Sequence, residues 1–417
     1  MGRPTYVCPD RLARTESGGA ISATLDDYVC SLYSSLPSVT TSANVLRSAL
    51  SRLAAASVAA ASLTAAAPAD APQSYDITAI DREVKAQCAS GTFSGVVLIQ
   101  AGSQRLYEHA CGMADPVNGI ANTRDTRFKI FSTSKFLTAL AVMRLAELGT
   151  LDLHAPVSRY VRDVPRTWRT VTLRMLLKHT SGVQDLSDLA FGSFRSTPEA
   201  AMRDTLARVP KDRARLLTPA GIAFAYNNFG FELLADAAAH AAGRPFAELL
   251  DTLVFKPAGM ATASVEPPNV LLGHPLAVTE PGVAIGFNGT PGKLEQATNY
   301  AFMQLGAGAV RGTVDDFVAL DRALSEGRVI SRESYAAMKR DLVTEPSGPA
   351  PRQFGLGMIV TTVNGVTMEG HTGGTNGYIS DFERLPGGVM MIALSNRGFT
   401  KTRWLREGVA EMVRQAR

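Results

Sequence analysis

The order of hydrophobic patterns along the chain limits the fold more than any other feature of the sequence. Strand-like segments occur at both ends of the main region, and helical patterns fill the residues between them. The first two, "SGVVLIQAG" and "QRLYEHACG", predict a hairpin, and the later ones are "FGLGMIVTTV", "VTMEG", "NGYISDFERL" and "GGVMMIALSN". We therefore expect one antiparallel sheet built from both ends of this region, with the helical middle inserted between its strands.

Apolar residues at helical spacing predict the helices. The predicted ranges are 76–90, 133–147, 197–208, 229–242, 245–254, 314–325 and 401–415. The fold class is therefore α+β: an antiparallel sheet flanked by helices, plus an inserted, mainly helical subdomain. We assign the sheet subdomain to residues 76–131 and 352–417, and the helical subdomain to residues 132–351.

The first seventy residues have a different composition. Arg47 and Arg52 precede the small and apolar stretch "LAAASVAAASLTAAA", and "APA" at Ala67–Ala69 matches the small-x-small pattern of a signal-peptidase site. Residues 45–69 therefore predict a signal peptide, with an alanine-rich linker as the alternative. We expect a periplasmic or secreted protein whose domain, residues 70–417, begins near Asp70, and we assign no function to the extension 1–44.

Composition and cysteine usage exclude several kinds of partner. A net charge of +4 without runs of like charge argues against nucleic acid, and the alanine-rich stretch is too short and too weakly apolar to span a membrane. No Cys-x-x-Cys or His-x-x-x-His occurs to suggest zinc, and no Gly-x-Gly-x-x-Gly after a strand and no P-loop occurs, so we expect neither a metal nor another cofactor. Cys88 and Cys111 remain after the predicted cleavage, and both a disulfide and two buried thiols are open.

A possible nucleophile lies in "FSTSKFLTAL", where Ser132 and Lys135 stand three residues apart at the start of a predicted helix. A chain of this length contains roughly one Ser-x-x-Lys by chance, so the pair alone proves nothing. On a helix, however, the two side chains share a face. A buried lysine loses hydration and can then act as a base toward the hydroxyl.

Two further motifs follow in order. Tyr226 and Asn228 lie before the helix in "AYNNFGFELLADAAAHAAG", and His371 to Gly373 lie on the predicted strand in "GHTGGTNGYIS". Together with Ser-x-x-Lys, they resemble the motifs of the serine β-lactamase and penicillin-binding-protein superfamily, above all class C β-lactamases, family VIII esterases and D-aminopeptidases. The segments "LDLHAPVSRYV", "VTLRMLLKHTSGVQD" and "GTVDDFVALDRALSEG" are also similar, so the resemblance covers residues 76–415.

The resemblance implies a role for each matching residue. Ser132 would be the acylated nucleophile, and Lys135 and Tyr226 would share the work of the general base. Asn228 would hydrogen-bond the substrate and Lys135, while the backbone N–H groups of Ser132 and Gly374 would form an oxyanion hole. The chain would then be a serine hydrolase acting on a small-molecule ester, amide or β-lactam.

The strand motif departs from the pattern of β-lactamases, which usually have a lysine where this chain has His371. A largely neutral imidazole gives the carboxylate of a β-lactam no permanent cation. Because His371 provides no such cation, we favour small esters or amides as substrates. Thr372 and Gly373 are further predicted substrate-binding residues. A β-lactamase, a D-Ala-D-Ala carboxypeptidase or a D-aminopeptidase remains the alternative, as does a non-enzymatic sensor or binding module that is acylated by β-lactams. His179, near a predicted helix end, is expected to cap that helix.

Overall fold

The computed structural model describes residues 74–190, 198–266, 282–297, 305–346, 352–375 and 377–416. The predicted extension 1–44 and signal peptide 45–69 lie outside these residues.

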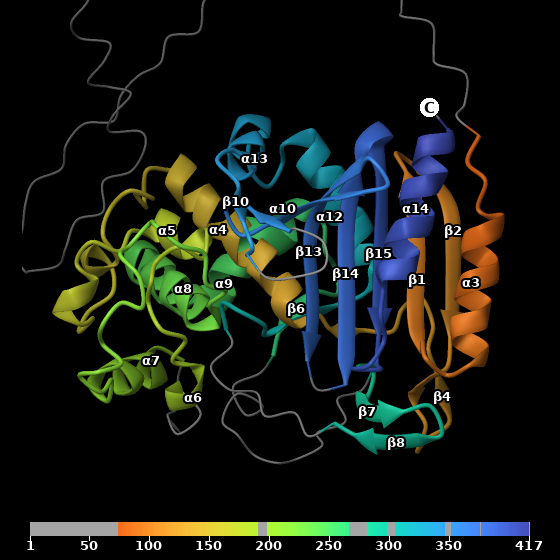
Figure 1. The fold of residues 1–417 in the computed structure, drawn as a ribbon, viewed down its shortest axis with the longest axis horizontal. Coiled ribbons are helices and arrows are strands. Elements are labelled where there is room, and N and C mark those ends of the chain that lie inside the picture. The colour runs from red at the N-terminus through yellow and green to blue at the C-terminus, as the bar shows by residue number, and fades with distance from the viewer. Residues whose placement is uncertain are drawn as a thin grey trace, which may run out of the picture. The chain divides into compact units, whose positions relative to one another are not determined.

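An eight-stranded antiparallel sheet forms the centre of the fold, in the order β10-β11-β12-β13-β14-β15-β1-β2 (Figure 1). Its strands are β1 (Gly95–Ala101), β2 (Gln104–Cys111), β10 (Val343–Thr344), β11 (Gln353–Phe354), β12 (Ile359–Val363), β13 (Val366–Thr375), β14 (Tyr378–Leu385) and β15 (Val389–Ser395). The early hairpin joins the late strands because β1 pairs along its whole length with β15, from Gly95 opposite Ser395 to Ala101 opposite Val389. The expected α+β class is confirmed.

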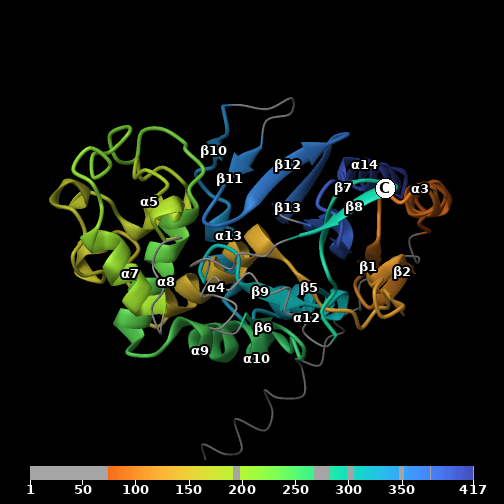
Figure 2. The same ribbon diagram turned by 90° about the horizontal axis from the view of Figure 1, so that it is seen from below.

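Helices cover both faces of this sheet. On one face lie α3 (Thr78–Ala89) and α14 (Arg403–Gln415), and on the other lie α4 (Ser134–Glu147) and α12 (Val314–Glu326), as Figure 2 shows for α14 and α12. Alternate residues of β1 serve the two sides: Val96 and Leu98 belong to the core around α4, and Val97 and Ile99 to the core under α14. A strand buried on both faces explains the unbroken apolar run in the sequence.

The remaining helices form most of the inserted part, and α5, α7 and α8 lie away from the sheet in Figure 2. They are α5 (Leu173–Leu177), α6 (Ser187–Ala190), α7 (Pro198–Ala207), α8 (Asn228–Ala242), α9 (Phe246–Leu250), α10 (Lys256–Ala258) and α13 (Arg332–Met338), with a π-helical turn at Asp251–Phe255. Single 3₁₀ turns occur at Phe131–Thr133, Val157–Arg159, Arg166–Trp168 and Pro386–Gly388. The inserted part is not purely helical, since β10 already belongs to the central sheet.

Three small sheets complete the described residues. They are β3 (Met113–Asp115) with β4 (Ile120–Ala121), β5 (Phe128–Lys129) with β9 (Val310–Gly312) and β6 (Ser264–Val265), and β7 (Phe287–Thr290) with β8 (Lys293–Gln296). The pairing of β5 with β9 matters for function, because it brings residues near 310 alongside the segment that leads into α4.

Local sequence signals explain where the longer helices begin and end. The hydroxyl of Thr313 accepts from the Asp316 N–H and the Asp316 carboxylate accepts from the Thr313 N–H, which forms a capping box at the start of α12. Gly243 ends α8 with a φ of 64°, a conformation that glycine adopts without a steric penalty.

A disulfide joins Cys88 at the end of α3 to Cys111 at the end of β2. It decides between the two alternatives that the sequence left open and ties the first helix to the edge of the sheet. Within the described ranges, the structure contains no helix that is long and apolar enough to cross a membrane.

Candidate active site

Ser132 lies in the 3₁₀ turn that leads from β5 into α4. The preceding residue, Phe131, has a φ of 44°, a left-handed conformation that is unusual for a bulky side chain, and its ring packs on Tyr378 at 5.7 Å between centroids. Strain of this kind is found at functional sites, where the surrounding structure maintains it. The turn places Ser132 just ahead of Ser134, the first residue of α4.

Lys135 is completely buried one turn further along. Its Nζ lies 3.1 Å from Ser132 Oγ, 2.8 Å from Asn228 Oδ1 and 3.0 Å from the carbonyl oxygen of Ala307. The amide oxygen and the carbonyl oxygen can only accept hydrogen bonds. Nζ therefore donates to both of these oxygens, and its remaining contact is with the hydroxyl of Ser132.

The start of α8 explains why Asn228 is available to Lys135. The N-cap is the preceding residue, Asn227, whose side chain accepts from the Gly230 N–H at 2.8 Å. Asp185 Oδ2 then accepts from both the backbone N–H and the Nδ2 of Asn228, at 3.0 and 3.2 Å. Because the carboxylate holds the NH₂ side of the amide, the oxygen faces Lys135.

The Tyr226 ring completes this side of the site, with Lys135 Nζ 5.1 Å from its centroid. The hydroxyl of Tyr226 makes no hydrogen bond to another described residue, so its share in base catalysis stays a prediction. The ring packs against the ring of His179, with 4.4 Å between centroids.

His179 ends α5 as expected: it follows the C-cap Lys178 in a left-handed conformation with a φ of 57°, and its N–H donates to the Leu176 carbonyl oxygen at 3.2 Å. In addition, its Nδ1 accepts from the backbone N–H of Asn227 at 3.1 Å and so holds the loop that carries Tyr226. Burial, and secondarily the charge of Lys135, lower the pKa of His179 well below its ordinary value, so the ring is neutral.

Strand β13 lies directly against the turn that carries the nucleophile. A Cβ on Gly373 would stand 2.0 Å from the Ile130 carbonyl oxygen and 2.9 Å from the Thr133 nitrogen, so only glycine fits there. Thr133 Oγ1 also donates to the His371 carbonyl oxygen at 3.2 Å. The structure thus brings together Ser132, Lys135, Tyr226, Asn228 and the strand motif, which the sequence predicted as one site.

His371 is buried on β13, and its Nδ1 lies 2.6 Å from the carbonyl oxygen of Thr372. Nδ1 therefore carries the proton of the neutral ring. Burial is the main cause that lowers the pKa of His371 to about 3, with a further contribution from Lys135, so the imidazole is uncharged near neutral pH. The substrate-binding roles of His371, Thr372, Gly373 and Gly374 stay predictions.

Comparison with known proteins agrees with this geometry. The family model described as Beta-lactamase matches residues 80–410. The chain belongs to the beta-lactamase family. Among curated members, it is 29% identical over 247 residues to the putative penicillin-binding protein PbpX of Bacillus subtilis, covering 59% of this chain and 58% of that protein.

Other relatives have names of different hydrolases. A D-aminopeptidase of Brucella anthropi is 26% identical over 312 residues, covering 73% of this chain and 56% of that protein. Esterase EstB of Burkholderia gladioli is 32% identical over 176 residues, covering 40% of this chain and 45% of that protein. The chain thus spans only about half the length of the curated relatives that it matches.

Solved structures share the fold of this beta-lactamase-family chain. A D-amino acid amidase from Ochrobactrum anthropi SV3, complexed with D-phenylalanine, superposes with a TM-score of 0.67 at 22% identity, covering 81% of this chain and 99% of that one. A penicillin-binding protein from Bacillus halodurans gives a TM-score of 0.65 at 21% identity, covering 79% and 98%.

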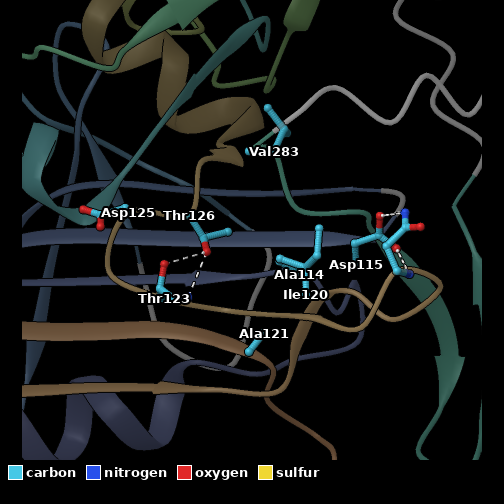
Figure 3. A pocket seen from close by; sticks show the side chains of 10 residues that line it. Ala114, Asp115, Ile120, Ala121, Thr123, Asp125, Thr126 and Val283 are labelled. Carbon is cyan, nitrogen blue, oxygen red and sulfur yellow. Dashed lines mark hydrogen bonds between the residues drawn. The ribbon is translucent and has the colours of Figure 1, made fainter.

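Two other features of this beta-lactamase-family chain lie outside the site. A cavity of about 490 Å³ is lined by residues of the segment 114–126 and by Gly282 and Val283, and none of the predicted site residues lines it (Figure 3). Among the described residues, one group with possible metal ligands is Cys88, His109 and Cys111. Its two sulfur atoms are joined in the disulfide and are therefore not available as thiolates.

Proposed function

We propose that the chain is a serine hydrolase that works through an acyl-enzyme, with Ser132 as the nucleophile. The position of Lys135 Nζ, 3.1 Å from Ser132 Oγ and between two acceptor-only partners, carries this proposal. A neutral lysine in this arrangement accepts the hydroxyl proton as Oγ attacks the carbonyl carbon of the substrate.

The remaining steps follow from the same groups. The proton taken by Lys135 passes to the leaving group, either directly or through the nearby Tyr226, and a covalent ester on Ser132 remains. Attack by water on this ester, with the proton transfer reversed, releases the acid and restores the hydroxyl. The N–H groups of Ser132 and Gly374 are the proposed donors to the oxyanion.

We propose small esters or amides as substrates, in preference to β-lactams. The neutral, buried ring of His371 supports this preference, because it provides no cation for the carboxylate of a β-lactam. Relatives named as an esterase and a D-aminopeptidase agree with it. Relatives named as penicillin-binding proteins keep a carboxypeptidase or β-lactamase as the second candidate.

We also propose that the protein is exported to the periplasm or secreted, with its mature chain beginning near Asp70. The disulfide between Cys88 and Cys111 supports export, because such bonds persist in oxidising compartments. N-terminal sequencing of the protein from its source cell tests this proposal. A chain that retains its first residues in the cytoplasm would contradict it.

The nucleophile is tested with Ser132→Ala, assayed on p-nitrophenyl butyrate, a D-amino-acid amide and a chromogenic cephalosporin. We expect hydrolysis to fall by about 10⁴-fold or more, because the covalent route is lost. Ser134→Ala is the matched control: Ser134 Oγ accepts from the Val310 N–H at 3.1 Å, so this change should lower stability and leave turnover in place.

The substrate panel separates the alternatives. Turnover of the ester or amide above the cephalosporin supports the proposal, and the reverse order would favour a β-lactamase. Stoichiometric labelling of Ser132 by a β-lactam, with no turnover of any substrate, would identify a sensor. Full activity in a folded Ser132→Ala protein would refute the mechanism.

A further inference from the structure

The orientation of the Lys135 amine depends on two acceptors, and one of them is a backbone carbonyl. Asn228 provides the first through its side chain, whereas Ala307 provides the second through its carbonyl oxygen. A backbone carbonyl stays in place only if its peptide segment is held. What holds the segment around Ala307 therefore determines how the amine meets the hydroxyl of Ser132.

Glu232 holds this segment. Its Oε1 accepts from the Ala307 N–H at 2.9 Å, and its Oε2 accepts from the Gly306 N–H at 3.2 Å. The carbonyl oxygen of Gly306 in turn accepts from Thr138 Oγ1 on α4 at 2.7 Å. Both helices that face the segment thus fix it through hydrogen bonds, and Glu232 takes both of its amide protons.

The sequence position of Glu232 is informative. It lies on α8 one turn after Asn228, so the two side chains share a face of the helix. One helix therefore supplies the first acceptor directly and holds the second through the backbone. Glu232 is only 4% exposed, and no other role in the hydrolysis requires a buried carboxylate there.

We infer that Glu232 is a positioning residue that acts through the amides of Gly306 and Ala307 to aim the Ala307 carbonyl at Lys135. The inference rests on the proposed function, since it concerns the base that activates Ser132. A purely structural role, in which the carboxylate merely satisfies two buried N–H groups, would affect stability but not the rate of acylation.

The charge state of Glu232 provides a second consequence. Burial is the main cause that raises the pKa of Glu232 to about 8. The hydrogen bonds from the backbone N–H groups and the charge of Lys135 lower this pKa, and the charge of Asp185 raises it. Only the ionised carboxylate offers both oxygens freely as acceptors. Acylation by the wild-type protein should therefore become faster as the pH rises through about 8.

The test is Glu232→Gln, which keeps one acceptor oxygen but turns an NH₂ group toward the second backbone N–H. We expect the rate constant of acylation, measured in single turnovers with a p-nitrophenyl ester, to fall by about tenfold to a hundredfold, because small misplacements of a reacting group are that costly. The substrate dissociation constant should not change. The rise of the rate near pH 8 should disappear.

Asp236→Asn is the matched control. Asp236 is a buried carboxylate one turn further along α8, but it pairs with His240 at 3.2 Å. Its replacement should change stability and leave both the acylation rate and its pH profile as in the wild type. A Glu232→Gln protein with the wild-type rate and profile would overturn the inference.

A second variant keeps the inference testable if Glu232→Gln does not fold. Glu232→Asp keeps the charge but is one methylene shorter, so it cannot reach both amides, and we expect it to acylate more slowly. If neither variant folds, the wild-type profile decides: a rate that stays flat between about pH 7 and 9 contradicts the inference. Loss of the proposed function is recognised separately, because Ser132→Ala would then retain activity.

Discussion

Two groups of buried carboxylates lie in different parts of the molecule and differ in how their oxygens are paired. Beside α4, both oxygens of Glu232 accept backbone N–H groups. Under α14, Asp381 and Glu383 are both almost fully buried on β14, and Arg406 lies 3.3 Å from the first and 3.9 Å from the second. These two carboxyls interact with each other, with the Thr402 side chain and with Arg406.

We interpret this difference as one between a candidate catalytic site around Lys135 and a packing face of the sheet under α14. Around Lys135, the amine has three oxygen partners that fix its direction, as a reacting group requires. Under α14, the carboxyls of Asp381 and Glu383 share the single guanidinium of Arg406, and burial raises the pKa of both carboxyls. We expect changes in the first region to affect turnover and changes in the second to affect stability.

The largest effect should come from Lys135→Met. Removing the amine leaves Ser132 without its base, so kcat/KM for an ester should fall by about 10³-fold or more, while the free energy of unfolding changes by less than about 2 kcal/mol. Stopped-flow kinetics and urea denaturation measure the two quantities. Lys129→Met is the control, because Lys129 is a buried lysine that pairs with Glu266 at 3.0 Å and should affect only stability.

The next effect concerns the disulfide on the α14 side. Cys88→Ser opens the loop between two residues 23 positions apart, and should lower the free energy of unfolding by about 3 kcal/mol. The value of kcat should stay within about twofold of the wild type, since neither cysteine contacts the site. Guanidinium denaturation and ester hydrolysis on the same preparation test both statements. A large loss of kcat in the folded variant would contradict the expectation that changes on the α14 side affect stability and not turnover.

The smallest effect should come from Arg406→Met, and it should depend on pH. Asp381 and Glu383 have ordinary pKa values of 3.8 and 4.5, and both are raised in the folded chain. The folded state therefore holds protons that the unfolded state has released, so stability falls as the pH rises above about 4.5. Without the guanidinium this fall should steepen, with a loss of about 2 kcal/mol at pH 8 and less than about 1 kcal/mol at pH 5.

Glu383→Gln is the companion variant for this prediction. A neutral amide no longer needs a proton to remain buried, so its stability should fall less with rising pH than that of the wild type. Thermal denaturation between about pH 5 and 8 compares the three proteins. If stability changed with pH by the same amount in all three proteins, the protonation of Asp381 and Glu383 would not be coupled to folding.

Local patterns were enough to predict most helices and strands. The periodic run from residue 133 and the alternating segments after residue 352 each have a signal in their own residues, and they match α4 and the strands β12 to β15. The predicted helix 245–254 was less accurate, because α9 ends at Leu250 and continues as a π-helical turn. A change of helical type leaves the apolar spacing almost unaltered, so the sequence shows little of it.

The site was predicted in its side chains but not in its supports. Asp185 lies 43 residues before Asn228, and no pattern links the two positions in the sequence. Asn227, and not the adjacent Asn228, is the N-cap of α8, and adjacent asparagines look alike until the helix start is known. The disulfide likewise needed the fold, since spacing alone does not say whether two cysteines meet.

Sequence patterns alone were sufficient to predict the candidate site: the serine, lysine and tyrosine motifs, their order, and most of the strands and helices that carry them. The contacts that orient Lys135, the proposed base, became visible only in the folded chain. The carbonyl of Ala307 reaches Lys135 across 172 residues, and Glu232 holds that segment through backbone amides. Every residue has a carbonyl and nearly every residue an N–H, so these contacts depend on where the chain passes and leave no mark in the identity of the residues.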